Sequence, residues 1–174
     1  MGCDIHIFAE YKVGDGPWIA DKKHTVYDEE GDPVELMVPD TWYQVDSFGC
    51  SRNYSLFGFL AGVRAPGPKS TGAPDDVSEM ISLAIKLYGE DGHNHSSLSL
   101  RQFKIRLTKA GYKMNKKLGF DIDNSPYGDR YPILINYLEH NEKKLKVDIE
   151  AEKELLGQDV NTKVKTRIVF FFDN

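Results

Sequence analysis

An acid and an imidazole stand two residues apart near the start of the chain, in the segment MGCDIHIFAE. Because side chains alternate between the two faces of a β-strand, Asp4 and His6 share one face of a strand predicted over 4–11. A carboxylate on a sheet face needs a partner, since burying an unpaired charge is costly. The two residues therefore fit either a hydrogen-bonded pair that stabilises the end of the sheet or one wall of a polar pocket.

Two further imidazoles, His93 and His95, follow Asp91 in the segment DGHNHSS. In extended backbone this spacing directs both rings to the same side, as many metal and phosphate sites require. The segment 90–97 is polar and is predicted to be a loop, where such a pair is also typical of a solvated surface. These imidazoles form a site only if they meet the first strand in space.

A third polar group, Arg52, Asn53 and Tyr54, comes immediately before a predicted short helix. Free amides at a helix N-terminus favour anions, and an arginine can bind phosphate or carboxylate through two parallel hydrogen bonds. Arg64 stands at the far end of the same element. The alternative is that Asn53 or Ser51 caps the helix and that the arginine is a surface residue.

The elements that must position these groups are both strands and helices. The N-terminal third alternates like an antiparallel meander, and the terminal TRIVFFFDN, apolar on both faces, predicts a central strand buried from both sides. The other predicted elements are strands at 25–28, 34–38 and 41–46, and helices at 52–63, from 75 or 76 to 88, at 99–110 and from 130. The predicted fold is α+β in a single domain over 1–174, with a mixed or mainly antiparallel sheet that includes the N- and C-terminal strands and is covered by three or four helices.

Local signals mark several boundaries. The segment 64–74 holds three prolines and two glycines, and it is predicted to be a loop that acts as a flap. Asp75 or Asp76 is expected to cap the helix that follows, and Ser99 with Gln102 fits a capping box. Gly58 and a second glycine four residues later allow close packing of the helix that carries them.

Composition limits the function classes. The chain has 174 residues, 40% hydrophobic content and a net charge of −5, as expected for a globular protein. The acidic balance disfavours a nucleic-acid polymer as partner, because such binders usually carry a basic face. Cys3 and Cys50 form no CxxC pair, and neither a long apolar run nor a secretory leader is present. We therefore expect a cytoplasmic protein without a membrane partner.

The segments MGCDIH, RNYSLFGFLAGVR, DGHNHSSLSL and RIVFFFDN, taken in this order, resemble a family of small phage and bacterial proteins. The resemblance spans nearly the whole chain. It implies that a set of polar residues belongs to the family pattern: Asp4, His6, Arg52, Asn53, Tyr54, Arg64, His93 and Ser96. By analogy, a phage setting implies a protein that acts on a nucleotide second messenger of host immunity.

These features favour a protein that sequesters a small phosphorylated or nucleotide-derived ligand, because arginines, histidines and aromatic rings occur without a known catalytic signature such as GxSxG, a P-loop or HExxH. The predicted ligand-binding residues are Asp4, His6, Arg52, Asn53, Tyr54, Arg64, His93, His95 and Ser96. A homodimer would fit this function, since small ligand-binding proteins can build their pockets at two-fold interfaces.

Two alternatives remain at this point. The first is a metal-dependent phosphohydrolase, in which one or two divalent cations activate water and neutralise a phosphate. Its metal ligands would be Asp4, His6, Asp91, His93 and His95. The second is a protein-interaction module that uses the 64–74 loop or the charged helix beginning at 130 as its contact surface.

Overall fold

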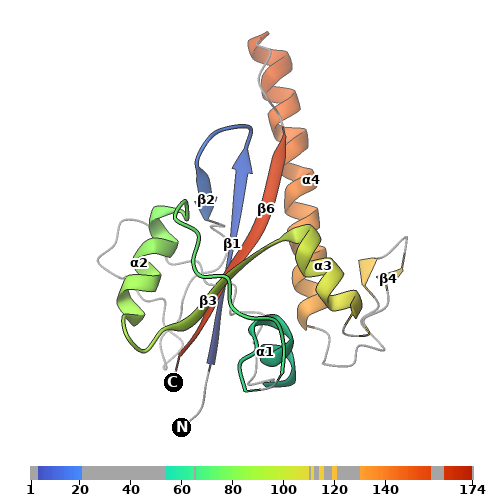
Figure 1. The fold of residues 1–174 in the computed structure, drawn as a ribbon. Coiled ribbons are helices and arrows are strands. Elements are labelled where there is room, and N and C mark those ends of the chain that lie inside the picture. Colours follow the sequence, from blue (N-terminus) through green and yellow to red (C-terminus); the bar gives the residue numbers. More distant parts are fainter. Residues whose placement is uncertain are drawn as a thin grey trace, which may run out of the picture.

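Two long strands from opposite ends of the chain form the centre of the protein (Figure 1). The structure is a computed structural model, and it describes residues 4–20, 54–64, 66–109, 111, 114–115, 119–120, 130–157 and 163–173. Strand β1 (Asp4–Val13) pairs antiparallel with β6 (Val164–Asp173) over the whole length of both. The first and last strands therefore share one continuous ladder of backbone hydrogen bonds.

The described part of the chain builds a four-stranded antiparallel sheet in the order β2-β1-β6-β3. Strand β2 (Trp18–Ala20) lies beyond β1, and β3 (His93–Ser99) lies on the free side of β6. This arrangement confirms the predicted sheet, including its N- and C-terminal strands. A separate short pair joins β4 (Met114–Asn115) to β5 (Gly119–Phe120).

Strand β6 is apolar on both faces, and both faces are covered. Ile168, Phe170 and Phe172 face one side, whereas Val169 and Phe171 face the other, and all five side chains are fully buried. A central strand without a solvated face needs such a run of apolar residues. The prediction from TRIVFFFDN is therefore confirmed.

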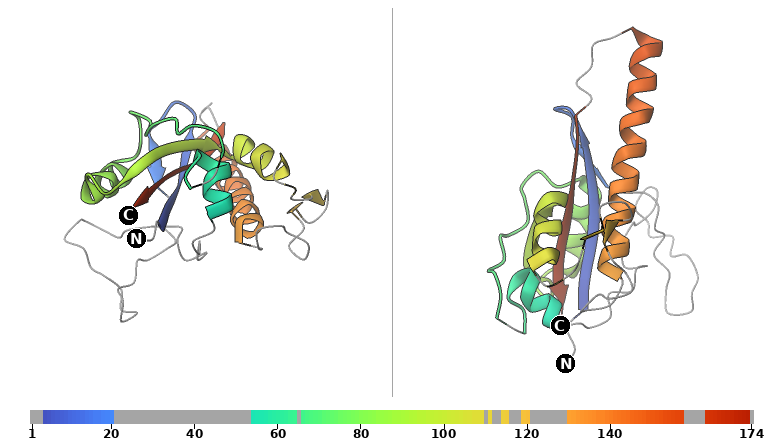
Figure 2. Two further views of the ribbon diagram at one scale, coloured as in Figure 1. Left: turned by 60° about the horizontal axis from the view of Figure 1, so that its bottom comes forward. Right: turned by 90° about the vertical axis from the view of Figure 1, so that its right-hand side faces the viewer.

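The helices divide between the two faces of the sheet (Figure 2). Helix α2 (Glu79–Tyr88) covers the face that carries Phe171, with Ile81 and Ala84 buried against it. The helices on the opposite face are α1 (Tyr54–Ala61), α3 (Leu100–Lys109) and α4 (Arg130–Leu156). The predicted α+β class is thus confirmed, with four helices within the described segments.

Helix α3 starts where its local sequence predicts. The Gln102 amide nitrogen donates to the Ser99 hydroxyl at 3.2 Å, and the Gln102 side-chain oxygen accepts from the Ser99 amide at 2.8 Å. These reciprocal bonds are a capping box. Helix α4 continues without a break through its charged middle, where Lys146 pairs with Glu142 at 2.6 Å.

Two boundaries differ from the prediction. The segment 90–97 was expected to be a loop, but most of it is the edge strand β3, whose backbone pairs with β6 although its side chains are polar. Helix α2 begins at Glu79 with Ser78 at its N-cap, so the prediction that Asp75 or Asp76 caps it is wrong. The Asp76 carboxylate instead accepts hydrogen bonds from Arg167 and Trp18. The predicted strands at 25–28, 34–38 and 41–46 lie outside the described residues. None of the described helices is long and apolar enough to cross a bilayer.

Candidate functional site

His6 of β1 and His95 of β3 approach the same aromatic ring. Their ring centroids lie 5.0 Å and 5.1 Å from that of Phe171, which belongs to the strand between them. Tyr88, the last residue of α2, lies over this group at 4.2 Å from His6. The first strand and the imidazole-bearing segment therefore meet, as the sequence hypothesis required. We call the group formed by His6, Tyr88, His95, Phe171 and Asp173 the His6–His95 site.

The acid beside His6 comes from the last strand. The Asp173 carboxylate lies 3.2 Å from Nε2 of His6, which is buried in the sheet face under α2. This contact fixes the orientation of the imidazole ring. Asp4 is directly opposite Asp173 in the strand register, but its side chain is not among those described. Sequence analysis missed Asp173 because the β1–β6 register is not visible in either strand alone.

His95 is the second imidazole of the site, and its environment favours the neutral form. Its Nε2 is buried and has no hydrogen-bond partner among the described residues. Burial lowers the pKa of His95 below 6.5, and the positive charge of His93 lowers this pKa further. A neutral imidazole offers one donor and one acceptor. The buried Nε2 can therefore bind a polar group of a ligand.

His93 points away from this site, so the expectation that both imidazoles face the same side is wrong. Its ring stacks on Phe172 at 6.1 Å, and its Nδ1 lies 2.7 Å from the side-chain oxygen of Asn94. The strand register shifts between His93 and Ser96, and Asn94 has a φ of 52°. A bulge of this kind redirects the side chains on either side of it.

The proposed metal site has no support in the described geometry. Among the described residues, no group of three or more His, Cys, Asp or Glu side chains lies close enough to hold a metal ion. His6 and His95 converge, whereas His93 faces the other side of the sheet and Asp91 is exposed in the turn after α2.

The arginine-bearing segment lies only partly within the described residues. Arg52 and Asn53 lie outside them, and Tyr54 begins α1 with a side chain that is not described. Arg64 is exposed directly after α1, the helix that packs on the face opposite to α2. The structure therefore does not bring Arg64 together with His6 and His95.

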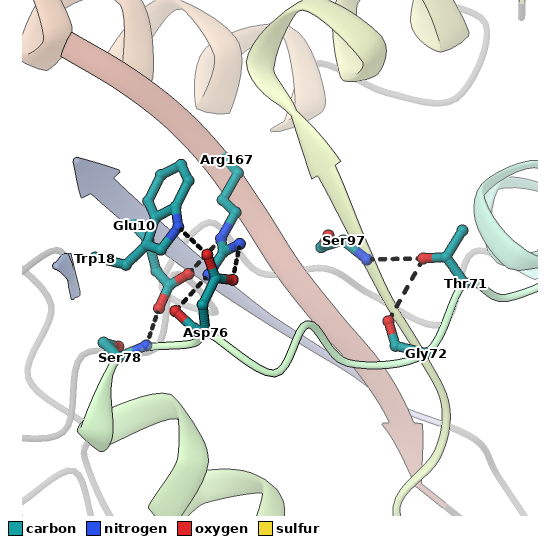
Figure 3. Close-up of polar contacts among 8 residues, drawn as sticks. All are labelled: Glu10, Trp18, Thr71, Gly72, Asp76, Ser78, Ser97 and Arg167. Carbon is teal, nitrogen blue, oxygen red and sulfur yellow. Dashed lines mark hydrogen bonds and ion pairs between the residues drawn. The ribbon is translucent and has the colours of Figure 1, made fainter. Parts of the chain in front are cut away.

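Ser96, another predicted site residue, holds the segment between α1 and α2. We call residues 66–78 the strap. The backbone amide of Thr71 donates to the buried Ser96 hydroxyl at 3.2 Å. In return, the Ser97 amide donates to the Thr71 hydroxyl at 3.3 Å (Figure 3). The predicted flap at 64–74 is thus attached to the edge strand β3 by side-chain hydrogen bonds.

The other end of the strap is held by a buried ionic group, also drawn in Figure 3. Glu10 is fully buried on the same face of β1 as His6. Its carboxylate accepts from Nε of Arg167 at 2.6 Å and from the Ser78 amide at 2.5 Å. The negative charge therefore lies at the N-terminus of α2, where the helix dipole stabilises it.

Asp76 extends this group to the surface. Arg167 donates to the Asp76 carboxylate at 2.8 Å and to its carbonyl at 3.1 Å, while the Trp18 indole donates to the carboxylate at 2.9 Å. The guanidinium of Arg167 also stacks on the Trp18 ring at 3.9 Å. The hydrogen bond from Arg167 lowers the pKa of Asp76 below its usual value. Glu10 and Arg167 are charged residues inside otherwise apolar strand segments, and this pattern is the sequence signal that could have identified the buried ionic group.

A groove of about 720 Å³ lies on the opposite face of the sheet, between α3 and α4. It is lined by Leu100, Arg101, Lys104, Ile105, Thr108, Lys109, Glu139 and Glu142. An ion pair between Lys104 and Glu139 links its two walls. None of the predicted site residues lines this groove, so it adds no support to the sequence hypothesis.

Comparisons of the chain with protein-family models, with curated proteins and with solved structures give no match. The resemblance to small phage and bacterial proteins therefore stays a prediction from four sequence segments. The structure itself defines an α+β protein with a four-stranded antiparallel sheet, counted over its described residues, and a histidine-aromatic group at one end of that sheet.

Proposed function

We propose that this protein binds and sequesters a small phosphorylated or nucleotide-derived molecule at the His6–His95 site. The observation that carries the proposal is the approach of two imidazoles from separate strands to one aromatic ring, with a buried Nε2 on His95 that has no hydrogen-bond partner within the described part of the chain. A buried polar atom without a partner is costly in a folded protein unless a bound group satisfies it.

The chemistry of the site suits a planar, polar ligand. The neutral His95 ring offers a hydrogen bond to the edge of a heterocycle, and the half-buried Tyr88, which packs on the buried Phe171, offers aromatic surface for a flat ring. His95 and Asp173 are both partly exposed, so this end of the sheet is open to solvent. Cyclic dinucleotides and ADP-ribose derivatives belong to this chemical class, and the proposal places the protein in the cytoplasm.

Isothermal calorimetry against nucleoside monophosphates, cyclic dinucleotides and ADP-ribose derivatives tests the proposal. We expect one class to bind and His95→Phe to weaken binding by about tenfold, because one hydrogen bond to the ligand is lost. His95→Gln keeps a donor and an acceptor and should retain part of the affinity. The matched control is His140→Phe, on the exposed side of α4. The absence of binding heat across the whole panel would overturn the proposal.

The same samples test the alternative of a metal-dependent phosphohydrolase, whose metal ligands would be those named from the sequence. Mass spectrometry of the ligand after incubation separates the two functions, because sequestration returns the molecule intact and hydrolysis returns its fragments. Repeating the incubation with Mn²⁺ or Zn²⁺ shows whether a metal is required. Cleavage that depends on added metal would favour the alternative.

A further inference from the structure

The groove between α3 and α4 lies on the face of the sheet opposite to α2, away from the His6–His95 site. We call it the α3–α4 groove. Its volume of about 720 Å³ is in the range of sites that bind ligands or side chains of a partner. Ile105, on the α3 wall, is 45% exposed, and the buried Leu100 lies beside it in the lining. The groove is therefore open to solvent and has an apolar part.

The α3–α4 groove carries an excess of positive charge. Three cations of α3 and two acids of α4 line it: Arg101, Lys104, Lys109, Glu139 and Glu142. Both acids already have partners, since Glu139 pairs with Lys104 and Glu142 binds Lys146 and the Thr166 hydroxyl. Among the described residues, no carboxylate pairs with Arg101 or Lys109. These two cations are therefore available to acids of a partner.

The two available cations stand in a regular row with an apolar residue between them. Arg101, Ile105 and Lys109 follow one another on α3 at intervals of four residues, and all three are exposed. Residues four apart lie on the same face of a helix. The eight residues from the first cation to the second correspond to about 12 Å along the helix axis, which is too far for one small anion to contact both. A helix with an acid, an apolar residue and a second acid at the same intervals is complementary to the row in charge and in spacing.

We propose that the α3–α4 groove binds an acidic amphipathic helix of a partner protein. The apolar residue of that helix packs on Ile105, and its two acids pair with Arg101 and Lys109. A nucleic acid is the less suitable occupant, because Ile105 interrupts the row of cations, whereas nucleic-acid surfaces carry continuous basic stripes. Two exposed ion pairs and one apolar contact give modest affinity, and we expect a dissociation constant of about 10–100 μM.

Fluorescence anisotropy with a labelled, designed peptide tests the proposal on the full chain. The probe is an alanine-based helical peptide in which two glutamates, eight residues apart, flank a leucine at the midpoint. We expect this glutamate peptide to bind, and Arg101→Glu/Lys109→Glu to weaken binding by about tenfold or more, because both ion pairs become repulsive. The matched control is Lys69→Glu/Lys86→Glu, which changes the net charge equally at exposed positions outside the groove and should bind like the parent.

A charge exchange tests the assigned contacts separately. A peptide with lysines in place of the two glutamates should not bind the parent, but it should bind the Arg101→Glu/Lys109→Glu protein, because the charges are again opposite. Ile105→Ser should weaken binding of the glutamate peptide by about threefold or more, since the apolar contact is lost. Circular dichroism of each variant verifies that the helices are retained.

Several results would overturn the proposal. One is unchanged anisotropy of the glutamate peptide at the highest attainable protein concentration, and another is an equal loss of binding in the two double variants. Binding that Ile105→Ser leaves intact would be unspecific attraction between charges and not docking. A labelled RNA that binds more tightly than the peptide and is lost in Arg101→Glu/Lys109→Glu would assign the groove to nucleic acid. Self-association of the chain that the same variant abolishes would assign it to a second copy.

Discussion

Arg167 of β6 stands opposite Glu10 of β1 in the register of the central strand pair, and its Nε donates to the Glu10 carboxylate at 2.6 Å. The two residues are 157 positions apart in sequence. Their contact fixes the two termini of the chain to each other, and through Ser78 and Asp76 it also fixes the end of the strap. Replacing both members of such a buried pair with apolar residues costs less stability than removing one member, because removing one leaves an unpaired charge in the interior.

Removing only one member of this pair should strongly destabilise the fold. Glu10→Ala leaves the buried Arg167 without its carboxylate, and we expect a loss of about 3–5 kcal/mol in the free energy of unfolding. Urea unfolding, monitored by circular dichroism, measures this loss in the free energy of unfolding. The control Lys146→Ala breaks the more exposed pair with Glu142 and should cost less than about 1 kcal/mol. Equal effects of the two variants would contradict the role assigned to the buried pair.

Stability should fall in acid partly because of Asp76. Its pKa is lowered in the folded protein, so its contribution is present above the unfolded value of about 3.9 and is lost as the pH falls through the lower folded value. The carboxylate is 62% exposed, so the effect is small. Urea unfolding between about pH 3 and pH 6 should give a shallower pH dependence for Asp76→Asn than for the parent. If the free energy of unfolding changes with pH equally in Asp76→Asn and in the parent, Asp76 does not contribute to the acid sensitivity.

His95 should also make folding pH-dependent, in a different range. Because its folded pKa is lowered, the unfolded chain takes up the proton first, and stability falls as the pH decreases below the unfolded value of about 6.5. The imidazole resonances of His95 should titrate with a midpoint below that value in an NMR experiment. His95→Gln should remove this part of the pH dependence. A titration midpoint above about 6.5 would show that burial does not determine the pKa of the His95 ring.

Gly67 of the strap packs directly against α1, so it should not accept a side chain. A Cβ at this position would lie only 1.6 Å from the carbonyl oxygen of Gly58, a backbone atom that cannot rotate away. We expect Gly67→Ala to destabilise the protein by about 2–3 kcal/mol. The control is Gly72→Ala, where nothing lies within 4 Å and the left-handed backbone alone costs about 1 kcal/mol. Thermal or urea unfolding compares the two variants, and an equal cost would contradict a tight contact between strap and helix.

Several features of the fold were predictable because they depend on local chemistry. The two-residue period of a strand separates Ile5 and Ile7 from His6, and the structure buries the first two against the α3–α4 side and His6 on the α2 side. The capping box of Ser99 and Gln102 is likewise a contact over three residues. Both depend on the geometry of one element, which its own residues specify.

The candidate site was predictable only in part. The sequence identified His6 and His95 as polar groups in unusual positions, but it assigned His93 to the same side of the strand. The bulge at Asn94 separates the two imidazoles. Asparagine tolerates the left-handed backbone better than most residues, but this weak preference does not by itself predict a bulge. The partner of His6 was also missed, because Asp173 belongs to the far end of the chain.

The amino-acid sequence by itself determined the two faces of β1, the capping box of Ser99 and Gln102 and the central position of TRIVFFFDN, since each follows from side-chain periodicity or from hydrogen bonds between near neighbours. Only the tertiary structure decided that Glu10 meets Arg167 and that His6 meets Asp173. The physical reason is register: the pairing of two strands from opposite ends of the chain is set by the packing of the whole sheet against its helices, and a shift of one residue would place every one of these side chains on the other face.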